Sequence, residues 1–594
     1  MIEDTGKYYT DLRLKYQQRV NDIIIKLKKI NRNVDEKLIN ESYIIAFNAH
    51  KGVMRDDKVT PYIEHPVEVA EILSDLEVDD VTISAALLHD VVEDSVITGN
   101  DIKRKYGETI SNIVDGLTKE KSKEKSKIEN QTHNYKKLVS GMISELRIII
   151  IKMADRLHNM KTLGHLSVDR KERIANETRN FFIPLANKLG MHKFKLELDD
   201  LVFKILDSRK YNEMIKSLDH YNNYNNTKVS EAVESIKSKL KNMNIDSEVS
   251  INRRSIYSIA SKINFKNFEE SKKYFSLKVV VGNKSNCYNV LQYIHEIFVP
   301  LNLISDYISG VKKNGYQSLH TKVMDKNGLV YEIIIRNVDM DVMADLGIIH
   351  LLYNINRDTE NSEYELNKYK DTLSSLYNDS FSSMEDHYEV IDIFHKNLVT
   401  GEIIISTPKD ETYTLPAGSS VLDFAYKIHT DIGNQCVAAK VNGQSKPVTY
   451  KLQNNDVVQI ITSRTTRPKE EWLDFVVTAR AIKSIKHSLK KSSALQNSEK
   501  KSILERFSIR KKVKEESPSK TVRSLEIITK FYDGFISRIE KEIKYIDRLL
   551  NMEIKIENET AFVIVKGEFI NDDQFRKFLK RVNSMKDIIN VYEL

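Results

Sequence analysis

The sequence predicts an α-rich protein of several domains, and three observations support this prediction. The chain has 594 residues, which at about 100–200 residues per domain corresponds to about three to five domains. It contains only 19 Gly and 9 Pro, the residues that most often interrupt helices. Apolar residues recur at helical spacing over residues 41–205 with scarcely any alternating stretch, and strand-like stretches are found further along the chain. We therefore expect an all-helical domain, a mixed α/β domain, a small β-rich domain and a helical C-terminal region with a short βαβ tail.

The composition excludes several classes of protein. Hydrophobic residues make up 41% of the chain and charged residues 30%, which argues against disordered and fibrous proteins. Two cysteines, Cys287 and Cys436, cannot build a disulfide framework or a four-cysteine zinc site. Any metal must therefore be held by His and carboxylate side chains. The sequence shows neither a signal-peptide pattern nor an apolar run of membrane-spanning length, so we expect a cytoplasmic protein without a membrane partner.

The first 205 residues are predicted to be helical. Residues 1–40 form a helical cap, and residues 41–205 form one all-helical domain. The run from Lys119 to Lys127 is rich in Lys, Glu and Ser and predicts a surface loop. Apolar residues at helical spacing include Ile23, Ile24, Leu27, Val67, Ala70, Leu73, Ile83, Ala86 and Leu87.

The pattern changes after an asparagine-rich patch, 221–226, which predicts a linker or loop. Residues 215–356 are predicted to form a mixed α/β domain, and residues 357–388 a polar linker. A β-rich domain is expected over 389–463. Strands are predicted at 276–281 and 329–335 in the α/β domain and at 402–405, 413–415, 437–441 and 457–461 in the β-rich domain, with helices at 283–298, 339–353 and 421–428.

The C-terminal region begins with a basic segment. Residues 464–545 are predicted to be helical, and the stretch from Arg480 to Lys514 holds twelve Lys or Arg residues but only two acidic ones. Such a charge run is either a solvated helix face or a contact surface for rRNA or tRNA. The tail, 546–594, is predicted to form strand, helix and strand at 561–565, 572–582 and 588–592.

The strongest chemical signal is the run Leu87-Leu88-His89-Asp90-Val91-Val92-Glu93-Asp94. On a continuous helix, one face would carry the imidazole of His89 and the carboxylates of Asp90, Glu93 and Asp94. Three carboxylates there would repel each other unless a cation held them together. A divalent metal therefore explains the pattern better than a structural role does.

Two further residues complete the predicted metal site. His65 precedes Pro66 at the start of a predicted helix, and Asp155 lies in an apolar helix with Asn159 one turn later. Nitrogen and oxygen donors without sulfur suit Mn²⁺, or else Zn²⁺ or Fe²⁺, and such a site would support metal-assisted hydrolysis. The alternative for a single buried His beside an Asp is a satisfied core pair.

These residues also carry a family resemblance, which extends over about 40–485. The chain resembles the long RelA/SpoT stringent-response enzymes, whose domains are an HD-type metal phosphohydrolase, an alarmone synthetase of nucleotidyltransferase type and a ubiquitin-like TGS domain. The resemblance places these domains at 41–205, 215–356 and 389–463. It rests on Pro61-Tyr62-Ile63-Glu64-His65-Pro66, His89-Asp90-Val91-Val92-Glu93-Asp94, Val114-Asp115-Gly116-Leu117-Thr118-Lys119, Ala154-Asp155-Arg156-Leu157-His158-Asn159-Met160, Asn314-Gly315-Tyr316-Gln317-Ser318-Leu319-His320-Thr321 and Leu422-Asp423-Phe424-Ala425-Tyr426-Lys427-Ile428-His429-Thr430.

The resemblance implies hydrolysis of guanosine tetra- and pentaphosphate, (p)ppGpp, to GDP or GTP and pyrophosphate, the 3′-diphosphatase reaction that controls the stringent response. By position, one Mn²⁺ would be bound by four residues and the nucleotide by three others. Arg55 fits less well, since its spacing is one residue longer than in the family, and its alternative role is a solvated loop charge. The implied metal ligands are His65, His89, Asp90 and Asp155, the catalytic pair is Glu93 and Asp94, and the substrate-binding residues are Arg55, Asn159 and Thr162.

The synthetase-like domain departs from the family pattern. Tyr316, Glu332 and Arg336 keep family positions, but Ser276 stands where the family has the aspartate that binds Mg²⁺. A serine hydroxyl does not replace a carboxylate at such a site. We therefore expect a degenerate, inactive synthetase fold, in which Tyr316 could still bind a guanine nucleotide. Further departures are Asn252 and Val281, both arginine in the family, and Ile334, which is glutamine there.

The TGS-like domain and the tail suggest possible partners. His429 falls at the TGS histidine that in relatives meets tRNA on the ribosome; the alternative is that this domain regulates the hydrolase in cis. The tail would supply only about half of an ACT-like unit. Alternative functions are a bifunctional (p)ppGpp synthetase/hydrolase, an HD nucleotidase acting on dNTPs, and a non-enzymatic ribosome or tRNA sensor.

Overall fold

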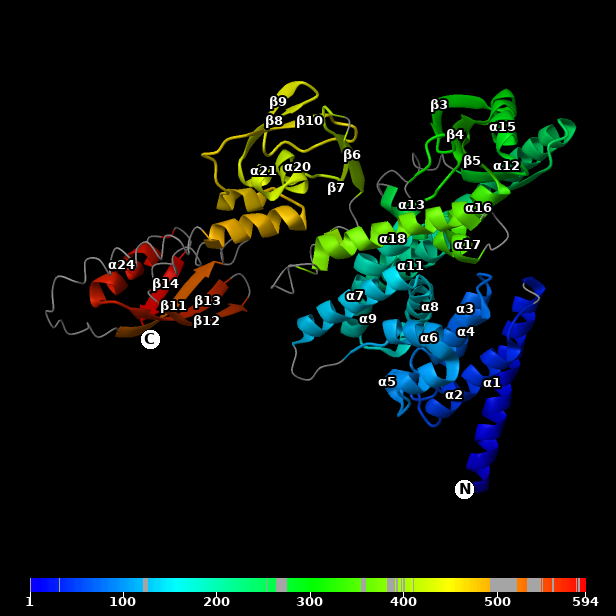
Figure 1. Ribbon diagram of the computed structural model, residues 1–594, viewed down its shortest axis with the longest axis horizontal. Coiled ribbons are helices and arrows are strands. Elements are labelled where there is room, and N and C mark those ends of the chain that lie inside the picture. The colour runs from blue at the N-terminus through cyan, green and yellow to red at the C-terminus, as the bar shows by residue number, and fades with distance from the viewer. Residues whose placement is uncertain are drawn as a thin grey trace. The chain divides into compact units, whose positions relative to one another are not determined.

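The chain forms two compact units, Met1–Ser492 and Ser493–Leu594. Figure 1 shows the computed structural model coloured along the chain. Within the described part, no helix has the length and hydrophobicity needed to span a bilayer. The structure describes residues 2–30, 33–120, 126–252, 254–262, 275–312, 314–353, 359–381, 390, 394–396, 398, 401–409, 411–491, 521–530, 546, 548–557, 560–583, 585 and 588–593.

The first domain is all-helical, as predicted. Several helices begin at side-chain caps: Asp79, Thr98 and Ser126 each accept a hydrogen bond from a backbone N–H of the first turn. Residues 121–125 of the predicted loop lie outside the described residues. The helices are α1 (Ile2–Ile30), α2 (Glu36–Ala49), α3 (Glu64–Ser74), α4 (Asp80–Leu88), α5 (Val91–Asp94), α6 (Gly99–Leu117), α7 (Lys127–Ser144), α8 (Arg147–Lys161), α9 (Val168–Glu177), α10 (Ile183–Lys188) and α11 (His192–Leu206).

Helix α8 lies at the centre of this domain and contacts α3, α4, α6, α7 and α11. Its first turns are apolar on every side, because Ile148, Ile149, Ile150 and Ile151 are all buried. A helix that is apolar all round is stable only inside a core. This burial carries the polar residues in the second half of α8 into the interior as well.

The second domain is built on a five-stranded sheet of order β1-β2-β5-β4-β3. Strands β2 and β5 are parallel, with Ser276 opposite Glu332, and the other pairs are antiparallel. Both predicted strands are confirmed. The elements are β1 (Ser247–Ile251), α13 (Ile256–Lys262), β2 (Phe275–Val281), α15 (Lys284–Ile297), β3 (Val299–Asp306), β4 (Leu319–Met324), β5 (Val330–Asn337), α16 (Val338–Leu346) and α17 (Ile348–Tyr353).

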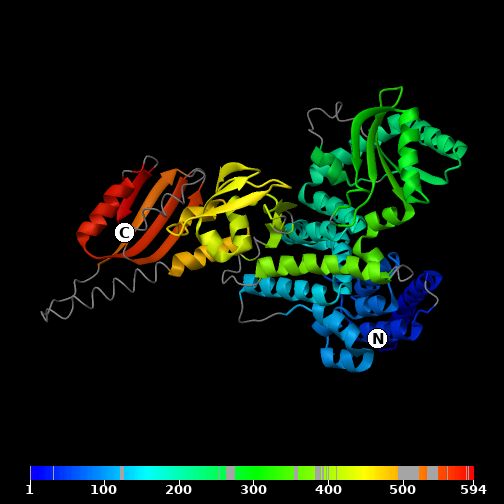
Figure 2. The ribbon, with the colours of Figure 1, turned by 45° about the horizontal axis from the view of Figure 1, so that its top comes forward.

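Two segments predicted as linkers are helical instead. The asparagine-rich patch 221–226 lies within α12 (Ser208–Asn242), because asparagine only weakly disfavours a helix and the apolar residues that follow the patch pack in the core of the second domain. The predicted linker 357–388 contains α18 (Thr359–Phe381), which packs on α7 (Figure 2). Tyr369, Leu373 and Leu376 are buried at helical spacing, and they extend the core of the first domain. Residues 382–389 lie outside the described residues.

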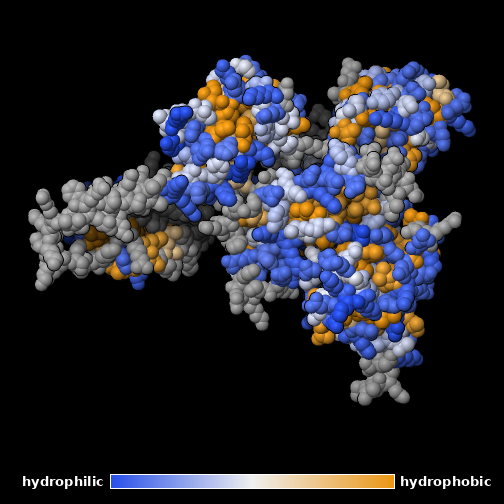
Figure 3. Space-filling view, in the orientation of Figure 1, coloured by the Kyte–Doolittle hydropathy of each residue, from blue (hydrophilic) through white to orange (hydrophobic). Residues whose placement is uncertain are grey.

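The third domain has the predicted strands and helix. Ser420 and Asp423 form a capping box at the start of α20. On the face shown in Figure 3, hydrophobic residues gather over this domain. Its elements are the hairpin of β6 (Glu402–Ser406) and β7 (Thr412–Pro416), helices α20 (Val421–Ile428) and α21 (Thr430–Asn434), and a sheet of β8 (Cys436–Val441), β9 (Gln444–Pro447) and β10 (Val458–Thr462) in the order β10-β8-β9.

The second unit holds an antiparallel sheet of order β12-β13-β11-β14. The predicted strand, helix and strand are confirmed as β13 (Thr560–Phe569), α24 (Asp572–Asn583) and β14 (Ile588–Glu593), but β12 (Arg548–Glu557) was not predicted. The helical prediction for 464–545 is wrong at β11 (Thr521–Lys530), where Leu525 and Ile527 are buried at strand spacing. Residues 492–520, which include most of the basic segment, lie outside the described residues.

The first two domains meet backbone to backbone at Gly347, between α16 and α17. The N–H of Ile348 donates to the carbonyl oxygen of Leu189 at 3.0 Å. Gly347 has a φ of +56°, and a Cβ there would lie 2.3 Å from that same oxygen. Only glycine fits this junction without displacing the backbone of the first domain.

We expect Gly347→Ala to destabilise the protein by about 2–5 kcal/mol, because alanine would have to adopt a left-handed backbone conformation and its Cβ would clash with the backbone of the first domain. Gly328 is the matched control, because its φ is also positive, at +78°, but a Cβ there meets nothing within 4 Å. Gly328→Ala should cost only about 1–2 kcal/mol. Urea unfolding followed by circular dichroism measures both, and equal losses would contradict a tight junction at Gly347.

Candidate metal centre

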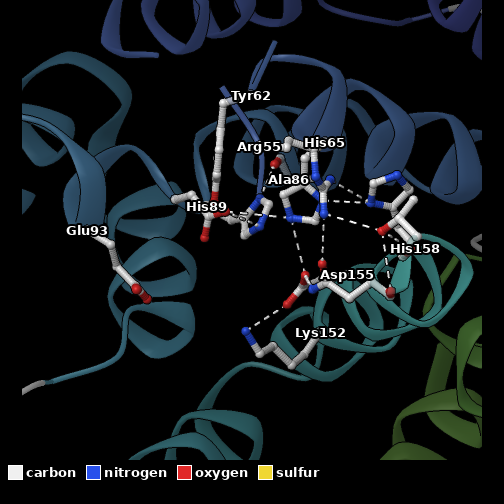
Figure 4. Close-up of polar contacts among 12 residues, drawn as sticks. Arg55, Tyr62, His65, Ala86, His89, Glu93, Lys152, Asp155 and His158 are labelled. Atoms are coloured by element: carbon white, nitrogen blue, oxygen red, sulfur yellow. Dashed lines mark hydrogen bonds and ion pairs between the residues drawn. The ribbon is translucent and has the colours of Figure 1, made fainter. Parts of the chain in front are cut away.

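Four side chains predicted as metal ligands converge inside the first domain (Figure 4). His65 comes from the first turn of α3, His89 and Asp90 from the junction of α4 and α5, and Asp155 from α8. Potential ligand atoms of His65, His89 and Asp155 lie within 4.8 Å of one another. The Oδ2 atom of Asp90 lies 3.2 Å from Nε2 of His89 and 3.6 Å from Nε2 of His65.

The local backbone differs from the predicted one at the His-Asp pair. We expected a continuous helix, but α4 ends at Leu88 and α5 begins at Val91. The apolar residues on both sides concealed this break, because they remain buried through it. The prediction that one helix face carries His89, Asp90, Glu93 and Asp94 is therefore wrong, although His89 and Asp90 still point into the cluster.

Each ligand candidate is oriented by a neighbouring group. The hydroxyl of Tyr62 donates to Oδ2 of Asp90 at 2.7 Å. The amide of Asn159 donates to Oδ1 of Asp155 at 2.5 Å, and the Nζ of Lys152 lies 2.8 Å from Oδ2. His89 Nδ1 lies 2.7 Å from the carbonyl oxygen of Ala86, which can accept only from an N–H. Donors of this kind around metal ligands fix both their orientation and the histidine tautomer.

The electrostatics of the cluster favour a cation. Burial disfavours the carboxylate of Asp90, but the imidazole of His89 outweighs burial and holds the pKa of Asp90 well below its usual range. Burial likewise opposes ionisation of Asp155, yet Lys152 and His65 hold its pKa well below the usual range. Burial would lower the pKa of His89, whereas Asp90 and Asp155 raise it to about 9. Two ionised carboxylates therefore face the imidazoles.

The donor set fits a divalent metal ion. Nε2 of His89 is buried and has no hydrogen-bond partner among the described residues, since its contact with Asp90 is not aligned for a hydrogen bond. A buried nitrogen of this kind is costly unless something binds it. Two imidazole nitrogens and two carboxylates are common ligands of Mn²⁺, Fe²⁺ and Zn²⁺.

The predicted catalytic pair lies beside the cluster. Glu93 is on α5 and its Oε1 accepts from the backbone N–H of Lys119 at 2.6 Å. Figure 4 shows its side chain apart from the histidines, and Asp94, at the end of α5, is exposed. Neither carboxylate is placed among the ligand candidates.

The three predicted nucleotide-binding residues lie together on the other side of the cluster. Nη2 of Arg55 lies 3.3 Å from Oδ1 of Asn159 and 3.3 Å from Oγ1 of Thr162. Thr162 caps the C-terminal end of α8. Lys152 and His158, both buried, were missed by the sequence prediction, although their spacing of three residues from Asp155 places them next to it on the same helix.

Comparison with known proteins identifies the family. Three family models match: HD domain (residues 42–192), Region found in RelA / SpoT proteins (252–358) and TGS domain (403–462). A guanosine-3′,5′-bis(diphosphate) 3′-pyrophosphohydrolase of Spiroplasma citri is 32% identical over 515 residues, which cover 83% of this chain and 68% of that protein. The chain belongs to the RelA/SpoT family.

Other RelA/SpoT relatives are longer than this chain. The bifunctional (p)ppGpp synthase/hydrolase SpoT of Escherichia coli K12 is 36% identical over 460 residues, and the match covers 76% of this chain but 65% of that protein. A GTP pyrophosphokinase of Myxococcus xanthus is 33% identical, over 77% of this chain and 61% of that protein. A solved structure described as a metazoan ortholog of SpoT that hydrolyzes ppGpp is 27% identical, over 28% of this chain and 94% of that one, with a TM-score of 0.24.

The RelA/SpoT-type second domain brings several departures together. Ser276 is buried, and the amide of Asn252 donates to its Oγ at 3.0 Å. Glu332, opposite Ser276, is paired with Arg254. Asn252 and Ser276, two positions where we expected departures from the family pattern, therefore form a hydrogen bond with each other.

Two further predicted site residues lie outside the metal centre, Tyr316 in the second domain and His429 in the TGS domain. The hydroxyl of Tyr316 accepts from Arg336 at 2.8 Å and lies 2.7 Å from Nε2 of His320. Burial, together with Arg336, lowers the pKa of His320 to about 4. His429 is on the surface of the TGS domain, where its side chain caps α21 and is 63% exposed.

We expect Lys152→Met to destabilise the metal-free protein by about 3–5 kcal/mol, because it leaves Asp155 buried without its cation. Lys137→Met is the matched control, since Lys137 pairs with the exposed carboxylates of Asp115 and Glu120 and should cost no more than about 1 kcal/mol. Thermal and urea unfolding in EDTA measures both. Equal stability of the two variants would contradict a strongly coupled Lys152–Asp155 pair.

Proposed function

We propose that this chain hydrolyses (p)ppGpp to GDP or GTP and pyrophosphate, with one Mn²⁺ held by His65, His89, Asp90 and Asp155. The observation that carries the proposal is the convergence of these four side chains, from three separate segments, around a buried imidazole nitrogen that has no hydrogen-bond partner in the described part of the chain. Relatives named guanosine-3′,5′-bis(diphosphate) 3′-pyrophosphohydrolase support the proposed substrate.

The roles of the residues follow from their chemistry. A Mn²⁺ held by these residues would lower the pKa of a bound water and polarise the 3′ phosphate. Glu93 and Asp94, beside the cluster, are the carboxylates that would orient the attacking water or take its proton. Arg55 holds the nucleotide together with Asn159 and Thr162, because its guanidinium suits phosphate oxygens and already lies against both side chains.

The second domain is proposed to be an inactive synthetase that remains as a scaffold. Synthesis of (p)ppGpp moves pyrophosphate from ATP, and phosphoryl transfer of this kind needs a carboxylate for Mg²⁺. Ser276 offers only a hydroxyl, which already accepts a hydrogen bond from Asn252. Tyr316 is partly exposed and is proposed to bind a guanine base, which would have to share its ring with Lys312 and Arg336.

The other domains are proposed to regulate or localise the hydrolase. Exposure of His429 supports a contact of the TGS domain with tRNA or the ribosome, and we propose a cytoplasmic location. The strand order β12-β13-β11-β14 with α24 before β14 supports an ACT-like tail. The proposed division is 1–40, 41–205, 215–356, 357–388 and 389–463, with α18 of the linker packed onto the hydrolase. The predicted boundary at 545/546 is dropped, because β11 belongs to the same sheet as the strands of the tail.

Asp90→Asn is expected to reduce hydrolysis to background, because it removes the negative charge of one ligand while keeping the side-chain shape. Labelled ppGpp is incubated with purified protein and Mn²⁺, and the nucleotides are resolved. The control is Asp75→Asn, which changes an exposed carboxylate after α3. This variant should hydrolyse ppGpp at the wild-type rate. EDTA should stop the reaction, and full activity of Asp90→Asn would contradict the assignment.

Ser276→Asp alone should not create synthesis, since Asn252 and Val281 still replace basic residues of the family pattern. The assay combines Mg²⁺, ATP and GDP and looks for new ppGpp. Wild type and variant should both give none. Synthesis by the wild type would mean that the chain is bifunctional, and synthesis by the variant alone would show that one carboxylate is the only missing part.

A further inference from the structure

His158 contacts a metal-ligand candidate but was not among the predicted site residues. It is buried on α8, three residues after Asp155, and its Nδ1 lies 2.7 Å from Nδ1 of His65 (Figure 4). Two ring nitrogens at this distance share a hydrogen, so one of them donates and the other accepts. The direction of this bond decides which nitrogen of His65 carries its proton.

Arg55, which also contacts His158, fixes the direction of this hydrogen bond. Nη1 of Arg55 lies 3.4 Å from the same Nδ1 of His158. Arginine is only a donor, so its guanidinium points to a nitrogen that has a free lone pair. Nδ1 of His158 is therefore the acceptor, and the N–H of the shorter bond belongs to Nδ1 of His65.

The position of this hydrogen on Nδ1 determines the state of Nε2, on the other side of the His65 ring. A neutral imidazole has one N–H, so Nε2 of His65 keeps its lone pair. Nε2 faces Oδ1 of Asp155 at 3.3 Å and Oδ2 of Asp90 at 3.6 Å. These oxygens already accept from Asn159 and Tyr62, so neither depends on a proton from His65.

We propose that His158 is a positioning residue that fixes the tautomer of His65 and thereby presents Nε2 of His65 as a metal ligand. The inference rests on the metal centre of the proposed function. Ligating histidines commonly donate their second N–H to a carboxylate or a backbone carbonyl, as His89 does to Ala86. His65 uses a second histidine instead, and this histidine also contacts Arg55.

The test measures Mn²⁺ binding by the full chain, with free Mn²⁺ followed by its EPR signal. His158→Gln and His158→Met have similar shapes, but only glutamine offers a carbonyl oxygen that can accept from His65. We expect His158→Met to weaken Mn²⁺ binding about 10–100-fold and His158→Gln to recover most of that loss. Met160→Leu, a buried change on the same helix at a side chain that accepts a hydrogen bond from Thr178, should bind as wild type does.

Four results would overturn the inference: no Mn²⁺ binding by the wild type, unchanged binding by His158→Met, equal losses in the glutamine and methionine variants, or an equal loss in Met160→Leu. Thermal melting in EDTA checks that each variant folds, and His158→Leu replaces the methionine variant if that one does not. The readout needs no nucleotide. Normal Mn²⁺ binding without ppGpp hydrolysis would therefore refute the proposed function and leave the role of His158 standing.

Discussion

The structure depends on keeping charge buried in an otherwise apolar domain. His65, His89, Asp155 and Lys152 are almost inaccessible to water, and burying such groups costs free energy unless each is paired. Pairing is achieved because α3, the α4–α5 junction and α8 bring opposite charges and hydrogen-bond donors to one point. The carboxylates stay ionised there, which is the condition for holding a cation.

Helix α8 connects this chemistry to the core. Its isoleucines anchor the first turns, and the helical repeat then places Lys152, Asp155 and Asn159 on successive turns of one side. Displacing this helix would move an ion pair, a ligand candidate and a nucleotide-binding candidate together. The same core receives α18, which follows the second domain along the chain, so changes in that domain can reach the helical bundle through packing.

The convergence of the ligand candidates could be predicted from the sequence because each lies in a short local pattern in or beside an apolar helix. The break between α4 and α5 could not, since Leu87, Leu88 and Val91 are buried whether the helix continues or not. The roles of Lys152 and His158 depend on tertiary neighbours that spacing alone does not reveal. For the same reason, α18 and β11 could not be predicted: their apolar residues lie within polar or basic segments, and only their packing partners show that they are buried.

The most direct test of this account is the position of the metal itself. Crystals grown with Mn²⁺ and measured near the manganese absorption edge should show one strong anomalous peak among Nε2 of His65, Nε2 of His89, Asp90 and Asp155, about 2.0–2.3 Å from each ligand atom. A peak there would establish that this buried cluster holds the metal. A fully occupied peak elsewhere, or none at saturating Mn²⁺, would contradict the central claim.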